Sequence, residues 1–122
     1  MSSRLLTCQV DEASLANIVH PSGEVDLSTV SILRQALTTA LSLGRHVIVD
    51  LSDVTYIDST GFRELLAHRR IYRENDRLMV LANPQHQVQD VIDTLNFYQV
   101  IPVFPSIDTA QNSLKGAPRP AR

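Results

Sequence analysis

The stretch that most constrains the fold is residues 47–62, VIVDLSDVTYIDSTGF, in which an apolar run is followed by a turn of small polar residues. The run 47–51 is rich in β-branched residues. It is too short for a helix and too continuous for a strand with one face in water, so it predicts a buried strand. After a turn at Ser52 and Asp53, we expect three apolar residues to return the chain to the core: Val54, Tyr56 and Ile57.

The polar residues at 58–60 mark the start of a helix. Asp58, Ser59 and Thr60 are all of types that cap helix N-termini. The apolar residues beyond them follow helical spacing: Phe62, Leu65, Leu66 and Tyr72. Ser59 is therefore predicted at a helix N-terminus that follows a strand, where backbone N–H groups are free and a negative charge is tolerated.

This block resembles the centre of a STAS domain, the fold of bacterial anti-sigma factor antagonists. The signature of that family reads roughly Asp-Leu-Ser, an apolar strand, and then Asp-Ser-(Ser/Thr)-Gly-Leu. Here its two parts are residues 50–52 and 58–62, with Phe62 in place of the usual leucine. In the family a partner kinase phosphorylates the serine after the aspartate, so the resemblance implies that Ser59 is phosphorylated. The alternative is that Ser59 only caps the helix.

Length and composition indicate one domain. A chain of 122 residues with 43% apolar content can bury a core without disulfides or metals. We expect a STAS domain over residues 1–115 and a disordered, Pro-rich tail over 116–122. No apolar run is long enough to span a membrane and no signal peptide is visible, so we expect a cytoplasmic protein with no membrane insertion. The single cysteine, Cys8, is expected to be a small apolar residue of the first strand.

The first half of the chain predicts a hairpin and a helix. Strands over Leu5–Val10 and Ser14–His20 are joined by a turn at 11–13, and residues 21–23 end the second strand. Gly-Glu-Val-Asp at 23–26 then matches the Gly-Glu-Leu-Asp landmark of the family. The resemblance implies that Glu24 and Asp26 lie near the phosphorylated serine and border the partner surface. Asp26 or Ser28 is also expected to cap a helix that ends at Gly44.

The second half alternates helices and strands. A helix over about 60–74 is followed by a strand at 78–82, a helix beginning at Pro84 and ending near 96–97, an edge strand at 100–104, and a last helix capped by Ser106. Asn75 and Asn96 are expected to replace the helix-ending glycines of the family. The prediction is an α/β fold: a single STAS domain with a mixed, mostly parallel sheet of four to five strands and about four helices.

The helix after Ser59 carries several arginines: Arg63, Arg69, Arg70 and Arg73. Because the net charge of the chain is −2, we interpret this as a solvated face that partly contacts an acidic partner, and not as a nucleic-acid site. Arg69 falls inside the apolar stripe, so its stem is expected to cover apolar surface while the guanidinium reaches the edge.

No catalytic motif is visible. The chain lacks a glycine-rich phosphate loop and the Gly-x-Ser-x-Gly of serine hydrolases, and it has only one Asp-Ser-Thr-Gly. The histidines show no spacing typical of metal ligands and are expected on the surface or with partners in the core: His20, His46, His68 and His86. We therefore expect neither enzyme activity nor a cofactor or metal.

The resulting hypothesis is a regulatory binding module in a partner-switching system that controls transcription, for example in a stress response. The resemblance implies that it binds an anti-sigma factor serine kinase of the GHKL type and releases a sigma factor. Phosphorylation of Ser59 switches it off, and a serine phosphatase resets it. A monomer or weak dimer is expected. The residues expected to contact the partner are Glu24, Asp26, Asp58, Ser59, Thr60, Gly61 and Arg63.

Three alternatives remain open from the sequence. The chain could be a STAS adaptor subunit of a lipid transporter or other membrane transporter, bound to the transporter ATPase. It could be a domain that binds a nucleotide or small ligand. It could also be an inert scaffold whose serine is not used.

Overall fold

This computed structural model describes residues 6–116 of the chain. The strands in this range form one mixed β-sheet. Its strands are β1 (Thr7–Glu12), β2 (Ala16–Val25), β3 (His46–Asp50), β4 (Asp53–Ile57), β5 (Met79–Ala82) and β6 (Val103–Phe104). The helices are α1 (Val30–Ser42), α2 (Ser59–Glu74), α3 (His86–Thr94) and α4 (Ile107–Lys115), with a 3₁₀ turn η1 (Phe97–Gln99). The predicted α/β class is confirmed.

The strand order is β1-β2-β3-β5-β6, and β4 pairs with β2. Within residues 6–116 only the β1–β2 pair is antiparallel, so the sheet is mixed and mostly parallel as predicted, and this part of the chain has six strands where four to five were expected. The predicted tail lies outside the described residues except for Gly116.

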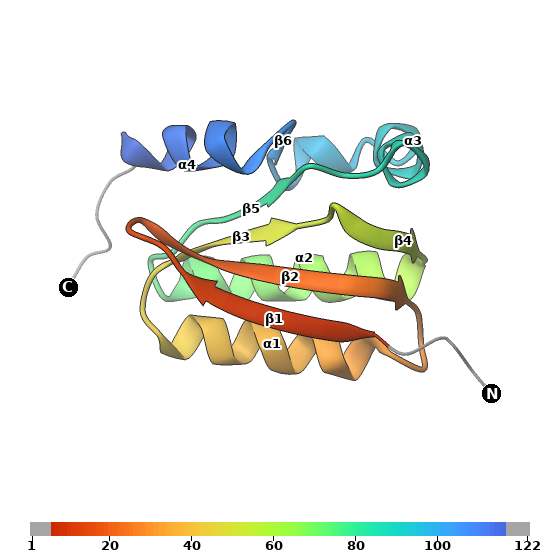
Figure 1. Cartoon of the computed structure of the whole chain (residues 1–122), viewed down its shortest axis with the longest axis horizontal. Coiled ribbons are helices and arrows are strands. Elements are labelled where there is room, and N and C mark those ends of the chain that lie inside the picture. Colours follow the sequence, from red (N-terminus) through yellow and green to blue (C-terminus); the bar gives the residue numbers. More distant parts are fainter. Residues whose placement is uncertain (1–5, 117–122) are drawn as a thin grey trace.

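Helices cover both faces of the sheet (Figure 1). Along one face, α1 and α2 pack over the larger core, in which Leu37 and Leu65 meet strand residues such as Val49. On the other face, Ala110 and Leu114 of α4 form a smaller cluster with residues of three central strands: Ile18, Ile48 and Val80. Burial of these two apolar layers supplies most of the driving force for the fold.

Strand β2 continues through the segment where the sequence predicted its end. Residues 16–19 pair with β3, and residues 22–25 pair with β4, with a register shift between Gly23 and Glu24. Pro21 lies at the point where the strand changes partner and opposes Cys8 of β1. The missing N–H of proline is tolerated at such a point, and Gly23 accepts a φ of 123°. The predicted strand end is therefore a bend.

Strand β4 presents one predicted core residue to solvent. Val54 and Ile57 are buried as expected, but the side chain of Tyr56 is 50% exposed. The register of β4 on β2 pairs Tyr56 with Glu24, at the bulge, and the adjacent Ile57 takes the inward position. The expectation that Tyr56 returns to the core is wrong, because sequence pattern alone does not reveal the bulge.

Three predicted helix boundaries are shifted. The N-cap of α1 is Thr29 and not Asp26 or Ser28. Helix α3 begins at His86 with Gln85 as its N-cap, two residues after the predicted start at Pro84, and it ends at Thr94. At the end of α2 the left-handed residue is Asp76 (φ 58°) and not Asn75 (φ −107°).

The C-terminal elements agree more closely with the conformations that the sequence predicted. Asn96 has the expected left-handed conformation, and Ser106 caps α4 by accepting a hydrogen bond from the Thr109 amide at 3.1 Å. Strand β6 lies at the sheet edge as predicted but is limited to Val103–Phe104. Two apolar residues in and just after α3, Val91 and Leu95, are 37% and 54% exposed.

Polar side chains join α1 to α2. The carboxylate of Glu64 binds Arg34 of α1 (Nη2–Oε1, 2.9 Å) and the buried His68 (Nδ1–Oε2, 2.9 Å). The hydrogen bond to Glu64 raises the pKa of Arg34. One turn further, the Tyr72 hydroxyl donates to the carbonyl oxygen of Leu37 at 2.9 Å. These contacts fix the position of α2, and with it the position of Ser59.

The histidines lie on the surface or with partners in the core, and Cys8 lies in the first strand, as predicted. His46 is buried and accepts a hydrogen bond from the Leu78 amide, whereas the side chain of His86 is 91% exposed. His20 bridges the carboxylates of Asp11 and Asp50. Cys8 lies half-buried in β1, where burial raises the pKa of its thiol to about 11 and keeps it protonated near neutral pH.

Candidate functional site

The turn between β4 and α2 is held by Asp58, the N-cap of the helix. One carboxylate oxygen of Asp58 accepts hydrogen bonds from the amides of Thr60 (2.9 Å) and Gly61 (3.2 Å). Its own amide donates to the carbonyl of Val25 at 3.2 Å, which ties the turn to the end of β2. Asp58 thus satisfies two of the free N–H groups at the start of α2 and fixes the turn on the sheet.

Ser59 is the first residue of α2, and its side chain is exposed. Thr60 is half-buried and Gly61 is buried. A Cβ atom built on Gly61 would come within 2.6 Å of Ile57 and 2.8 Å of Val25. At this point α2 therefore lies closer to the sheet than a residue with a side chain would allow. Gly61 therefore sets how close the helix lies to the sheet, and Ser59 is the hydroxyl that a second protein can reach.

A shallow depression of about 410 Å³ lies beside this turn and is lined by Glu24, Asp26, Tyr56 and Asp58. These residues come from the end of β2, the loop after it, β4 and the cap of α2. The structure thus brings the family landmark at 23–26 next to the turn that carries Ser59, as the sequence comparison implied. Tyr56 belongs to this surface as well.

The loop from β2 to α1 is held by its own side chains. Asp26 accepts hydrogen bonds from the amide and hydroxyl of Ser28, at 3.0 and 2.7 Å. The Thr29 hydroxyl donates to the carbonyl of Glu24 at 2.8 Å. Between them Leu27 projects outward with 79% of its surface exposed. This leucine and Tyr56 are two surface residues that sequence reasoning missed; the available signal was that Leu27 falls outside the helical apolar pattern.

Charge is distributed unevenly around Ser59. Three acidic residues, Glu24, Asp26 and Asp58, line the depression, and Arg63 lies exposed one helical turn further along α2. The only group that could abstract a proton next to Ser59 in sequence is the Asp58 carboxylate, which already accepts two amide hydrogen bonds. The site therefore offers an accessible hydroxyl in an acidic surround, without a free general base adjacent to it in the chain.

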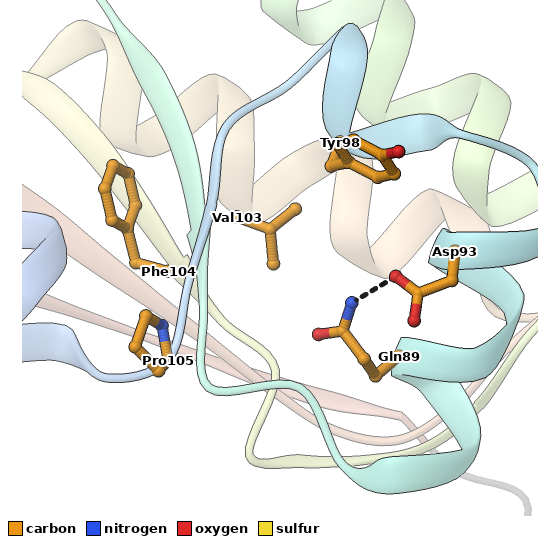
Figure 2. Close-up of a pocket in the computed structure, with 6 residues that line it drawn as sticks. All are labelled: Gln89, Asp93, Tyr98, Val103, Phe104 and Pro105. Carbon is orange, nitrogen blue, oxygen red and sulfur yellow. Dashed lines mark hydrogen bonds between the residues drawn. The ribbon is translucent and has the colours of Figure 1, made fainter.

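Another depression lies between α3, η1 and β6 and has a volume of about 450 Å³ (Figure 2). Val103, Phe104 and Pro105 form one side, and Tyr98 stands at its rim. Its polar groups are Gln89 and Asp93, which hydrogen-bond to each other at 2.8 Å. This lining contains no nucleophile paired with a base. In the described part of the chain no group of three His, Cys, Asp or Glu residues could hold a metal ion, and no helix could cross a membrane.

Comparison with known proteins agrees with this geometry. A Mycobacterium tuberculosis protein described as a candidate anti-anti-sigma factor is 26% identical over 120 residues, covering 96% of this chain and 80% of that protein. The anti-sigma factor antagonist SpoIIAA in its unphosphorylated form has a TM-score of 0.73 and 19% identity, covering 93% of this chain and all of its own. The Bacillus SpoIIAA structure in the phosphorylated form gives a TM-score of 0.65 and 18% identity over 88% of this chain and 98% of that one.

The same fold occurs inside a much larger protein. The murine anion transporter Slc26a9 matches 86% of this chain with a TM-score of 0.74 and 24% identity, but the match covers only 18% of the transporter. At these identities the structural likeness establishes the fold and leaves the function open. The family model described as STAS domain matches residues 8–110, from β1 into α4, and includes the whole Ser59 surface. By this match over most of its length, this chain belongs to the STAS domain family.

Proposed function

We propose that this protein is an anti-sigma factor antagonist whose binding to its anti-sigma factor is switched by phosphorylation of Ser59. The observation that carries the proposal is the exposed Ser59 hydroxyl at the start of α2, beside a depression formed by the Glu24–Asp26 loop, Tyr56 and Asp58. The names of the M. tuberculosis and SpoIIAA relatives support an anti-sigma factor as the partner. This is a binding role, and the protein itself is not an enzyme.

The unphosphorylated surface suits a protein partner. Leu27 and Tyr56 expose apolar area beside polar groups that are held in place by the loop, and such rigid, mixed surfaces lose little entropy on binding. Burial of these two side chains supplies the apolar part of the contact. The adjacent carboxylates of Glu24 and Asp26 select a partner with complementary charge.

The phosphoryl donor in this proposal is ATP held by a GHKL-type kinase, the anti-sigma factor itself. The Ser59 oxygen forms a bond to the γ-phosphorus while the bond to the leaving ADP breaks, and the hydroxyl proton passes to a base on the partner. That base must come from the partner because the Asp58 carboxylate is already engaged with the backbone of α2. A separate serine phosphatase restores the hydroxyl.

Phosphate on Ser59 adds about −1.5 to −2 charge beside the three acids of the depression. The Thr60 and Gly61 amides cannot compensate this charge, since Asp58 already occupies them. A partner that packs against the neutral hydroxyl would have to desolvate the phosphate. A loss of about 3 kcal/mol in binding lowers affinity more than a hundredfold. The domain itself stays folded, because Ser59 is exposed and buries no group.

The test is intact-mass analysis of the protein purified from its native cell under growth and stress. We expect a phosphate-sized increment that disappears in Ser59→Ala but persists in Ser31→Ala, a matched exposed serine of α1. Isothermal titration with the candidate anti-sigma factor then compares wild type with Ser59→Asp. Unchanged affinity of Ser59→Asp, or absence of phosphate in every condition, would contradict the switch. Stable co-purification with a transporter ATPase would instead indicate an adaptor.

A further inference from the structure

The C-terminal half of α2 carries a second surface feature, away from the Ser59 turn. A groove of about 670 Å³ is lined by Leu66, Arg69, Arg70, Arg73, Glu74 and Val100, and we call it the α2–η1 groove. Leu66 and Arg69 are half-buried, which agrees with the expectation that the stem of Arg69 covers apolar surface. The other charged residues are exposed. Three guanidinium groups therefore meet a single carboxylate in one concave surface.

These three arginines are not used to hold the fold. Within residues 6–116, Arg69, Arg70 and Arg73 form no ion pair and no side-chain hydrogen bond. Two other arginines do form ion pairs: Arg34 binds Glu64 at 2.9 Å and Arg45 binds Glu12 at 3.3 Å. A cluster of unpaired cations on a chain of net charge −2 repels itself and gains free energy from an anionic partner.

The groove also has an apolar side. Leu66 packs at the edge of the main core, and Val100 is 40% exposed directly after η1. A simple anion would engage the guanidinium groups and leave this apolar surface in water. A ligand that uses both sides must combine negative charge with an apolar group, which describes an acidic peptide better than a nucleic-acid backbone.

We propose that the α2–η1 groove docks an acidic segment of a partner protein, with carboxylates on the arginines and one apolar side chain between Leu66 and Val100. The proposal does not require phosphorylation of Ser59. It is compatible with one partner using both surfaces, because Ser59 and Arg73 lie on the same stripe of α2 as Leu66 and Arg70. At a rise of about 1.5 Å per residue, Ser59 and Arg73 are separated by about 21 Å.

The test is fluorescence anisotropy with a labelled peptide of glutamates around one leucine, compared with an all-glutamate peptide of the same length. We expect Arg73→Gln to weaken binding of the leucine peptide by about threefold to tenfold, and Arg70→Gln/Arg73→Gln by more. The control is Lys115→Gln, which removes one exposed positive charge on α4 and should leave binding unchanged. Val100→Ser should weaken the leucine peptide and not the all-glutamate peptide. Amide NMR shifts should localise the peptide to residues 66–74 and 98–100.

Several results would overturn the proposal. No binding of the leucine peptide up to about 1 mM excludes an acidic-peptide site of useful affinity. Equal loss in Lys115→Gln and Arg73→Gln would show non-specific charge attraction. Equal binding of the two peptides, unaffected by Val100→Ser, would show an anion site only. Preferential, Arg73-dependent binding to phosphatidylglycerol vesicles would assign the groove to a membrane surface. None of these readouts depends on Ser59, so the proposal can fail while the phosphorylation switch stands.

Discussion

Replacing Gly61 by alanine tests how closely α2 must approach the sheet. The new Cβ would lie 2.6 Å from Ile57 Cγ1, 2.8 Å from Val25 Cγ1 and 2.9 Å from Ile57 Cδ1. Real Cβ atoms are essentially never that close to another heavy atom, so the helix or both strands must shift. Neither partner can yield easily, because Val25 is 1% and Ile57 is 5% exposed and both belong to the main core.

The expected change in the free energy of unfolding for Gly61→Ala is the difference between two effects. Overpacking of this kind costs about 1–3 kcal/mol. Alanine recovers about 0.5–1 kcal/mol through its better helix propensity, less near a helix start. We therefore expect Gly61→Ala to lower the free energy of unfolding by about 1–2 kcal/mol. The displaced α2 should also carry Ser59 away from the depression and reduce partner binding.

Urea unfolding of wild type, Gly61→Ala and Gly116→Ala provides the measurement. Gly116 is the matched control, since a Cβ there meets nothing within 4 Å. Ile57→Ala removes two of the three close atoms, so Gly61→Ala should cost less in that background. If Gly61→Ala proves as stable as wild type, or its cost is the same with and without the Ile57 side chain, then steric packing at this glycine does not position α2.

Three further predictions concern other residues. Asp58→Ala should lower the free energy of unfolding by about 1 kcal/mol through loss of the cap, while Asp58→Asn, which keeps an acceptor oxygen, should lose much less; equal losses in urea unfolding would contradict the capping role. Tyr72→Phe should cost about 1 kcal/mol because its buried hydroxyl donates to α1, whereas the half-exposed Tyr98→Phe should cost almost nothing. Burial, and secondarily the positive charge of a neighbouring arginine, lowers the pKa of His46 below 6.5, so the folded protein keeps this group neutral. The unfolded chain takes up a proton as pH falls through its ordinary value, so stability should decline below about pH 6.5. His46→Asn should flatten that decline relative to wild type and the exposed His86→Gln, and parallel pH profiles for all three proteins would refute the assignment.

Elements fixed by local chemistry were predictable from the sequence. The run at 47–51 is buried on every residue, because a central parallel strand has helices over both faces. Ser106 caps α4 and Asn96 adopts a left-handed conformation, as their residue types indicate. In each case the residue and its immediate neighbours decide the conformation.

Features fixed by distant partners were not predictable. Pro21 looks like a strand terminator unless it is known that β2 exchanges β3 for β4 at that point. Thr29 is the N-cap of α1 although its hydroxyl makes no cap hydrogen bond and donates instead to the carbonyl of Glu24, and neighbouring residues offer equally good caps.

The candidate site also contains some features that the sequence predicted and others that depend on distant partners. The resemblance implied that Glu24 and Asp26 lie near Ser59, and both line a depression with the adjacent Asp58. The exposure of Tyr56 follows from the bulge between β2 and β4. Leu27 falls outside the apolar pattern of the following helix, and this signal of an outward position was not used. Roles of these residues in binding a partner remain predictions.

The bend in β2 has a dynamic consequence. The segment of β2 beyond Pro21 pairs with β4, and its last residue accepts the hydrogen bond from the Asp58 amide. It therefore holds in place β4, the Ser59 turn and the Glu24–Asp26 loop that follows it. Local unfolding of this short segment would therefore release every part of the recognition surface in one step. Native-state hydrogen exchange should show the amides of residues 22–25 and 54–58 opening together, with a lower free energy than the amides of residues 17–19 and 47–49 on the other side of the bend. The recognition surface would then be present or absent as one cooperative unit.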